Sequence, residues 1–300
     1  MTVGESSAGD DVPAGSSNRL LIVNADDYGM TSGISSGIIA AFERGVVTST
    51  SALTVAAAFD RHAQQLVDSG IPTGAHLAAV GEDRPLLSAR EIPTLVDRDG
   101  RFPLRWREFV QRAATGRVDP SDLTREFRAQ LTRLRDLGVN VTHLDSHQNI
   151  HLWPSVARVV IDLAVTDGVG AVRLPTARGS SPTAIAVRRL TGHLRRLAAR
   201  AGRAFPDESS GIEGQPAPHD AGLLSSLDRL DATGAASAEI VLHLAVDPDP
   251  ERAAYPSRYA WAAQFAAAID PAARARIDEL GFRLGSFADL RPAARTAVGR

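Results

Sequence analysis

The 300-residue sequence contains no cysteine. This absence excludes disulfide bonds, thiolate metal sites and a cysteine nucleophile, and it leaves His, Asp and Glu as ligands for any metal. The formal net charge is only −2, so the chain lacks a basic excess, and we expect no nucleic-acid partner. No apolar run is long enough for a membrane-spanning helix. Hydrophobic residues nevertheless make up 44% of the chain, enough for a substantial core.

The two ends of the chain differ from the part between them. Residues 1–18, MTVGESSAGDDVPAGSSN, are small and polar, and they lack the charged and apolar regions of a secretory signal. We therefore predict a disordered N-terminal tail and a cytoplasmic protein. Residues 19–292 are expected to form one domain, and residues 293–300 a C-terminal tail.

Short apolar or β-branched runs alternate with helix-like segments along the domain. The predicted strands are 20–25, 48–55, 74–80, 139–145, 171–175, 238–245 and 281–287. The predicted helices are 31–44, 59–69, 120–137, 154–166 and 271–280, each ending near a glycine. This alternation favours parallel strands with crossover helices.

About seven strands of this kind predict an α/β fold, an imperfect (β/α) barrel in a single domain, with an open doubly wound sheet as the alternative. The pattern is weakest over residues 81–119 and 176–237. We expect long loops or extra helices there, shaping the substrate pocket.

Polar residues follow the predicted strands at one end. They are Asp26, Asp27, His76, Asp145, His147, Arg173 and His243. Because the carboxyl ends of parallel barrel strands share one face, these distant residues are expected to converge. This face is where we place the chemistry.

Two neighbouring acids, Asp26 and Asp27, follow the first predicted strand. Such a pair is commonly a helix N-cap. Here, however, Tyr28, Gly29 and Met30 intervene before Thr31, itself a good N-cap. The acids are therefore predicted to serve as a metal ligand and a general base.

Residues 143–153, HLDSHQNIHLW, gather His143, His147 and His151 around Asp145. On a strand His143 and Asp145 face the same way, and a carboxylate beside a ligating imidazole fixes its tautomer. One carboxylate and two imidazoles favour Zn²⁺, Fe²⁺, Mn²⁺ or Co²⁺ over Mg²⁺. His76, taken alone, is more typical of a hydrogen-bonded core histidine than of a metal ligand.

Three blocks of sequence resemble the YdjC-like carbohydrate deacetylase family. They are LLIVNADDYGMTSGISSGIIAAFERGVVTSTSALTV, GAHLAAVGEDRPLL and THLDSHQNIHLWPSVARVVIDLA followed by VRLP. The family includes chitooligosaccharide deacetylases and a hopanoid-biosynthesis-associated branch. The resemblance extends over about residues 19–290 and is weakest where the strand pattern is weakest.

The resemblance implies an imperfect (β/α) barrel in which Asp27, His76 and His147 hold one divalent ion, Mg²⁺ or Zn²⁺. By analogy with other metal-dependent sugar deacetylases, Asp26 is the general base. The implied reaction is hydrolysis of an acetylamino sugar, chitooligosaccharide-like or glycolipid-linked N-acetylglucosamine, to acetate and a free amine. The resemblance also allows a homodimer.

The remaining polar residues receive supporting roles in this interpretation. The leaving amine needs a proton donor, for which His243 is the first candidate and His151 the second. Arg173 is expected to orient Asp26 or a substrate hydroxyl, or to form a structural buried ion pair. His143, Asp145 and His151 are placed beside the ligands or the substrate.

Two departures from the family pattern affect the substrate more than the metal ligands. Many members read DSHxHxH, whereas this chain has Asn149 at the middle position, which excludes a proton shuttle there. Many also have a His-Pro pair where this chain has His243 and Leu244. Two other functions remain open: a metal-dependent phosphoesterase and a non-catalytic sugar-binding barrel.

Overall fold

A computed structural model of the protein describes residues 19–211, 222–257 and 259–292. The predicted tails, 1–18 and 293–300, lie outside the described residues. None of the helices that the structure describes combines the length and the apolar character needed to cross a membrane.

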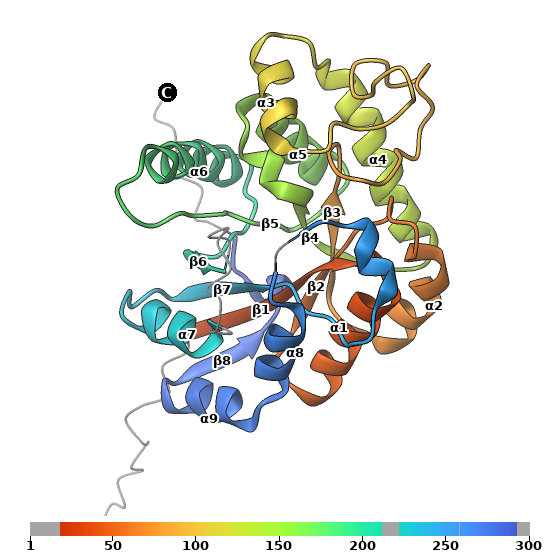
Figure 1. The fold of residues 1–300 in the computed structure, drawn as a ribbon. Helices are drawn as coiled ribbons and strands as arrows, with labels where there is room; N and C mark the ends of the chain where they lie inside the picture. Colours follow the sequence, from red (N-terminus) through yellow and green to blue (C-terminus); the bar gives the residue numbers. More distant parts are fainter. Residues whose placement is uncertain (1–18, 212–221, 258, 293–300) are drawn as a thin grey trace, which may run out of the picture.

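The described strands form one eight-stranded sheet in which every pairing is parallel (Figure 1). Seven of them follow the order β5-β4-β3-β2-β1-β7-β6, and β8 pairs with β1. Their bounds are β1 Arg19–Tyr28, β2 Ser49–Ala52, β3 Thr73–Leu77, β4 Val141–Ser146, β5 Ala171–Val172, β6 Glu208–Ser210, β7 Ser237–Leu242 and β8 Phe282–Gly285. This order is that of a curled (β/α) barrel, as predicted, with its break between β5 and β6.

Helices lie outside the curled sheet (Figure 1). Their bounds are α1 Ser32–Arg44, α2 Phe59–Ser69, α3 Trp106–Ala114, α4 Pro120–Asp136, α5 Pro154–Thr166, α6 Pro182–Arg200, α7 Leu223–Asp231, α8 Trp261–Ile269 and α9 Pro271–Glu279. Short 3₁₀ segments cover His147–Leu152, Pro250–Ala254 and Phe287–Asp289. Thr31 caps α1 as predicted, since its side chain accepts a hydrogen bond from the Ile34 amide.

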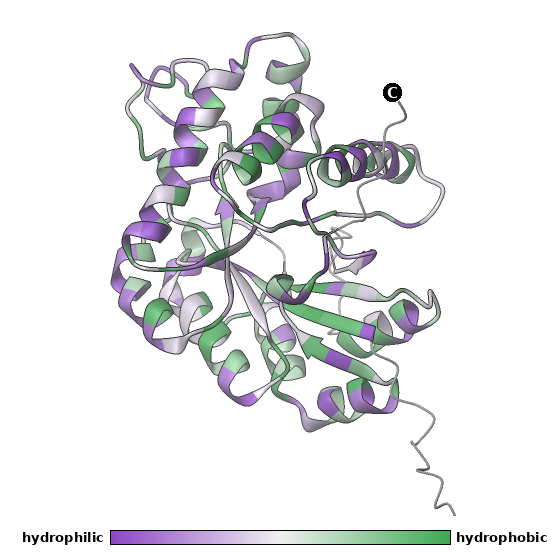
Figure 2. Cartoon of the chain, turned by 180° about the vertical axis from the view of Figure 1, so that it is seen from behind, coloured by the Kyte–Doolittle hydropathy of each residue, from purple (hydrophilic) through white to green (hydrophobic). Residues whose placement is uncertain are grey.

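The strand β1 has two buried faces. Leu21, Val23 and Ala25 belong to the large core that extends to the helices. Leu20 and Ile22, one residue out of phase, pack instead with Phe287 in a second cluster. Figure 2 shows hydrophobic stretches on the strands and mixed character on each helix. This second cluster fills the amino-terminal end of the barrel interior and leaves the carboxyl end for polar groups.

The predicted strands were found, with boundaries shifted by a few residues. Sequence reasoning missed β6, because ESS is short and polar, and it missed α8, which lies in an alanine-rich stretch. Residues 81–119 and 176–237, where the strand pattern is weakest, contain extra helices as expected. The first region contains α3, and the second contains α6 and α7.

Candidate active site

The end of β1 places two adjacent carboxylates on one side of the sheet. Successive strand residues normally face opposite sides. Here the pairing of β1 with β2 is irregular between Ala25 and Tyr28, and Asp27 has a φ of 70°. This bulge interrupts the alternation. Asp26 and Asp27, which are 4% and 2% exposed, consequently border the same small cavity.

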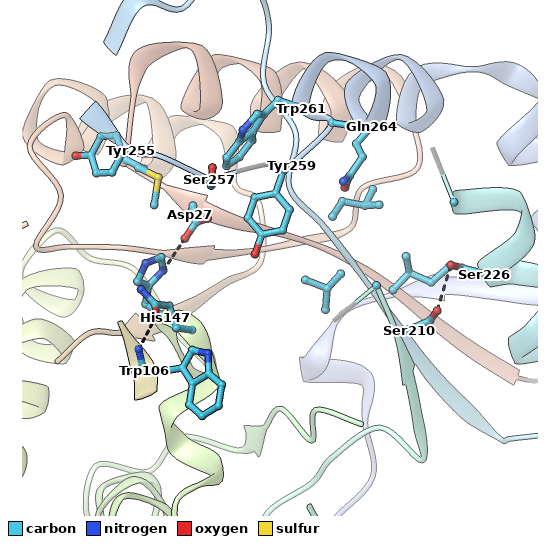
Figure 3. Close-up of a pocket in the computed structure, with 18 of the residues that line it drawn as sticks. Asp27, Trp106, His147, Ser210, Ser226, Tyr255, Ser257, Tyr259, Trp261 and Gln264 are labelled. Atoms are coloured by element: carbon cyan, nitrogen blue, oxygen red, sulfur yellow. Dashed lines mark hydrogen bonds and ion pairs between the residues drawn. The ribbon is translucent and has the colours of Figure 1, made fainter. Parts of the chain in front are cut away.

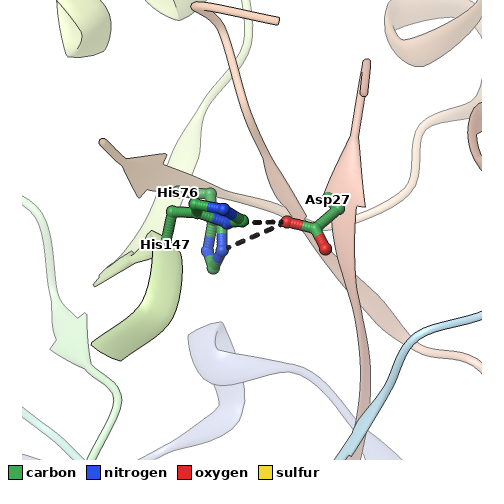
Figure 4. Close-up of side chains that lie close together, drawn as sticks. All are labelled: Asp27, His76 and His147. Atoms are coloured by element: carbon green, nitrogen blue, oxygen red, sulfur yellow. Dashed lines mark hydrogen bonds and ion pairs between the residues drawn. The ribbon is translucent and has the colours of Figure 1, made fainter. Parts of the chain in front are cut away.

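One carboxylate oxygen of Asp27 faces two imidazole nitrogens from other strands (Figure 4). Its Oδ1 lies 3.1 Å from Nδ1 of His147 and 3.5 Å from Nε2 of His76. One ligand atom from each of the three residues falls within 4.8 Å of the others. The sequence-predicted metal ligands are therefore brought together, and their oxygen and two nitrogens suit a divalent transition metal.

The other nitrogen of His76 is held by a carboxylate. Its Nδ1 lies 2.9 Å from Oδ1 of Asp145, and the second oxygen of Asp145 accepts a hydrogen bond from Ser51 at 2.8 Å. Metal-binding histidines typically have such a carboxylate partner, which fixes the ring and its tautomer. The group thus fits a metal in its surroundings as well as in its ligand atoms.

Arg173 connects the candidate base, Asp26, to Asp145, the carboxylate that holds His76. Its guanidinium, 1% exposed, donates two hydrogen bonds to Asp26, at 2.7 and 2.8 Å. It also pairs with Asp145 at 2.5 Å and with Glu239 at 2.8 Å. Asn24 adds a hydrogen bond to Asp26 at 2.8 Å. The buried arginine therefore contacts Asp26 and also forms buried ion pairs, so the geometry is compatible with either of these predicted roles.

Three carboxylates share the single arginine of this buried network, and this excess of negative charge shifts the pKa values of its members. Burial lowers the pKa of His76, but Asp145, Asp26 and Asp27 outweigh burial and raise it to about 9. Burial raises the pKa of Glu239 to about 7, with Arg173 opposing and Asp26 adding to the rise. Burial also raises the pKa of Asp27, yet the His147 and His76 imidazoles hold it well below its ordinary value.

The candidate proton donor, His243, lies just beyond β7 on the same cavity. Its Nε2 is 3.9 Å from Oδ2 of Asp26, and its ring stacks on Tyr259 at a centroid distance of 3.7 Å. Its backbone amide donates to Gln264 at 2.8 Å. Burial lowers the pKa of His243, and the Asp26 and Asp27 carboxylates oppose this shift.

His143 and His151 are not among the residues that line the cavity in the described part of the chain. His143 lies deeper, stacked on Phe287 and 3.1 Å from Ser51 Oγ; a side chain at Gly74 would overlap its ring. His151 Nδ1 lies 2.7 Å from Ser146 Oγ. Burial lowers their pKa values to about 3 and 4, so both are neutral near pH 7.

The cavity above the candidate ligands has a volume of about 60 Å³ and opens into a cleft of about 1260 Å³. Figure 3 shows this cleft, with Asp27 and His147 on one side and Ser210 and Ser226 on the other. Sequence reasoning missed its aromatic residues, which are Trp106, Tyr255, Tyr259 and Trp261. The segment YPSRYAW, residues 255–261, contains three of the chain's 3 tyrosines and 3 tryptophans. This concentration of aromatic residues could have indicated a binding surface there.

Comparisons with known proteins identify the family of the chain. Residues 20–279 match the profile of the YdjC-like protein family. A chitooligosaccharide deacetylase of Klebsiella pneumoniae strain 342 is 33% identical over 277 residues, covering 91% of this chain and 99% of that protein. A human carbohydrate deacetylase is 38% identical over 161 residues, 53% of this chain and 49% of that protein.

A solved structure from Enterococcus faecalis V583, named for cellobiose-phosphate cleavage, superimposes with a TM-score of 0.73 at 25% identity. The superposition covers 90% of this chain and 98% of that one. The resemblance in fold thus extends over most of both chains.

Proposed function

Because the chain belongs to the YdjC-like protein family, we propose that it is a metal-dependent carbohydrate deacetylase. It hydrolyses the acetamido group of an N-acetylated sugar to acetate and a free amine. The observation that carries the proposal is the convergence of Asp27, His76 and His147 beside a second carboxylate, Asp26, in one small cavity. Chitooligosaccharides and glycolipid-linked N-acetylglucosamine are the proposed substrates.

In this mechanism Asp27, His76 and His147 hold one divalent cation, with Mg²⁺ and Zn²⁺ as the candidates. The chemistry that a bound cation supplies is polarisation of the amide carbonyl and activation of water. The bond from His76 to Asp145, 2.9 Å long, keeps the Nε2 nitrogen aimed at Asp27. His76 would offer this nitrogen as a ligand only in its neutral form, so a protonated His76 would first have to release its proton.

Asp26 acts as the general base that accepts a proton from the attacking water. Its position follows from the two hydrogen bonds of Arg173, which fix the carboxylate plane, and from its place next to Asp27. A base must lie within hydrogen-bond reach of the proton that it accepts. Asp26 borders the cavity in which the water and the amide carbonyl meet.

His243 acts as the general acid that protonates the leaving nitrogen. An unprotonated amide nitrogen is too poor a leaving group, so the carbon–nitrogen bond breaks only as this proton arrives. His243 lines the cavity and lies 3.9 Å from Asp26, whereas His151 is fully buried behind Ser146. This difference in access favours His243 over His151.

The sizes of the two spaces fit an acetylated sugar. A cavity of about 60 Å³ has room for a group of a few atoms, since one water occupies roughly 10–15 Å³ by this measure. An acetyl group fits there, and the sugar ring remains in the larger cleft outside. The cavity would therefore select the acetyl group that is removed, and the cleft would select the sugar that carries it.

The direct test is acetate release by the purified protein supplied with Zn²⁺, Co²⁺ or Mg²⁺. The panel should contain N-acetylglucosamine, short chitooligosaccharides, glycolipids with a terminal acetylamino sugar, and phosphorylated sugars. We expect acetate and a new amine in equal amounts, abolished by chelator and restored by added metal. Phosphate release without acetate would support a phosphoesterase instead, and sugar binding without any product would support a binding protein.

A further inference from the structure

The cleft contains a tryptophan that is far more exposed than is usual for this residue type. Trp106, the first residue of α3, is 41% exposed and lines the cleft together with Asp27, His147 and Tyr259 (Figure 3). Tryptophan is highly buried on average in folded proteins. Leaving an indole ring in water forfeits the stabilisation that its burial would give, so its exposure in a ligand cleft indicates a binding role.

The loop that bears Trp106 is fastened to the neighbour of a candidate metal ligand. Gln148 Oε1 accepts a hydrogen bond from the Trp106 amide at 2.8 Å, and its Nε2 donates to the Leu104 carbonyl at 2.9 Å. Gln148 has a φ of 52°, a left-handed conformation that turns its side chain toward this loop directly after His147. These two hydrogen bonds therefore fix the position of the Trp106 backbone relative to the candidate metal ligands.

Arg107 constrains the indole ring further. Its guanidinium carbon lies 5.3 Å from the ring centroid, in the range of a cation–π contact. Trp106 and Arg107 both line the cleft, so this contact holds the ring at the cleft surface. An oriented, flat, apolar surface of this kind matches the C–H face of a pyranose ring.

The dimensions of the cleft exceed what one sugar needs. Its volume of about 1260 Å³ lies above the roughly 300–1,000 Å³ typical of small-molecule pockets. Tyr259 lines both the small cavity and the cleft, whereas Trp106 lines the cleft and not the cavity. Tyr259 is therefore next to the sugar whose acetyl group enters the cavity, and Trp106 is farther out.

Building on the deacetylase function proposed above, we infer that Trp106 is the stacking platform for a second sugar ring, linked to the ring that loses its acetyl group. The substrate class is accordingly an oligosaccharide of at least two residues, and Gln148 is the positioning residue for this subsite. Binding energy gained at the second ring raises kcat/KM for the longer substrate without any new contact at the reacting amide.

The first test compares substrates of different length with the metal-loaded enzyme. The wild type is expected to show a higher kcat/KM for N-acetylglucosamine di- and trisaccharides than for the monosaccharide. Trp106→Ala should reduce this ratio about tenfold, equivalent to ~1.4 kcal/mol. Trp106→Phe should keep most of it, and Gln148→Glu, which cannot donate to the Leu104 carbonyl, should fall between the two.

The matched control is Val165→Ala, an exposed apolar residue on α5 outside the cleft, which should keep the wild-type ratio. A Trp106→Ala enzyme with an unchanged ratio, or one that loses activity equally on all lengths, would overturn the assignment. If the monosaccharide is not turned over, Trp106→Ala should instead lower kcat/KM for the disaccharide about tenfold, and Trp106→Phe should keep most of it. Absence of acetate from every substrate with the wild type would instead reject the proposed function.

A second measurement follows the ring itself. Among the three tryptophans, Trp106 is the exposed one, and Trp261 is 8% exposed. Glucosamine oligosaccharides, which are products and react no further, should therefore shield the wild-type fluorescence from acrylamide. Trp106→Phe should remove this shielding. Shielding that persists in Trp106→Phe would show that the sugar contacts another tryptophan and would refute the platform.

Discussion

Strands β1 to β4 and strands β5 to β6 form two sides of the barrel that differ in how continuously they are paired. The first side begins with the ten residues of β1, and each strand is paired with the next through to β4. The second side consists of β5 and β6, strands of two and three residues. In the described chain, Ala171 of β5 forms an isolated bridge with Ala204, which precedes β6.

The two sides also carry different functions. Asp27 and His76 lie near the carboxyl ends of β1 and β3, and His147 directly follows β4, so all three belong to the continuous side. The interrupted side borders the wide cleft through Ser210 and Gly211. Ligand positions must be held to within about half an ångström, which continuous pairing provides. A substrate cleft needs room, and an interruption in the barrel provides it.

The largest effect is expected from removing a ligand on the continuous side. His76→Ala or His147→Ala should eliminate bound metal and reduce acetate release to background, while the packed core keeps the protein folded. Elemental analysis and circular dichroism check both parts. His62→Ala, a half-buried histidine on α2 outside the cleft, is the control. Full metal occupancy in His76→Ala would contradict the ligand assignment.

Replacing the base should separate catalysis from metal binding. Asp26→Asn is expected to retain the metal and to lower kcat by roughly 10²–10⁴-fold, the usual contribution of a positioned general base. Asp68→Asn, an exposed acid on α2, provides the matched control. If Asp26→Asn loses its metal, the roles of the two adjacent acids are reversed.

Arg173 links the two sides, because it follows β5 and pairs with carboxylates of β1, β4 and β7. Arg173→Gln leaves these buried carboxylates without their cation. Breaking a buried ion pair in this way typically lowers stability by ~3–5 kcal/mol. Urea denaturation measures this loss. A variant as stable as the wild type would show that water or protons replace the arginine.

The pH dependence of the metal-free protein should report on His76. Its folded-state pKa of about 9 exceeds the ordinary 6.5, so it stabilises the fold fully below pH 6.5 and loses this contribution as the pH rises to 9. Urea denaturation of the metal-free proteins at pH 6 and 9.5 measures the free energy of unfolding. This free energy should decrease more between the two pH values in the wild type than in His76→Ala. Equal decreases would mean that His76 titrates normally.

The smallest effect is expected on the interrupted side. The Ser209 hydroxyl of β6 donates to the Leu174 carbonyl at 3.1 Å, a contact between the β5 and β6 segments. Ser209→Ala should lower stability by ~1 kcal/mol, the usual net value of one hydrogen bond, with little change in acetate release. A large loss of activity would show that the active site depends on both sides equally.

Sequence patterns located most of this architecture and the convergence of the strand ends. The period of two along β7 also contains a signal that sequence reasoning left unused: Glu239, Val241 and His243 alternate toward one side, which places Glu239 beneath His243. The hydrogen bonds between Gln148 and the Trp106 loop could not be predicted. They join segments 42 and 44 residues apart, and loops carry no periodicity from which such contacts follow.

The positive φ of Asp27 has a consequence for how related sequences are interpreted. The φ of Asp27 is 70°, a value that glycine, asparagine and aspartate adopt more readily than most other residues. A single nucleotide change to Asn or Gly at this codon would therefore preserve the turn while removing the carboxylate. Natural relatives with either residue here are expected to be stably folded pseudoenzymes, and a deep mutational scan should separate abundance from catalysis most sharply at this position.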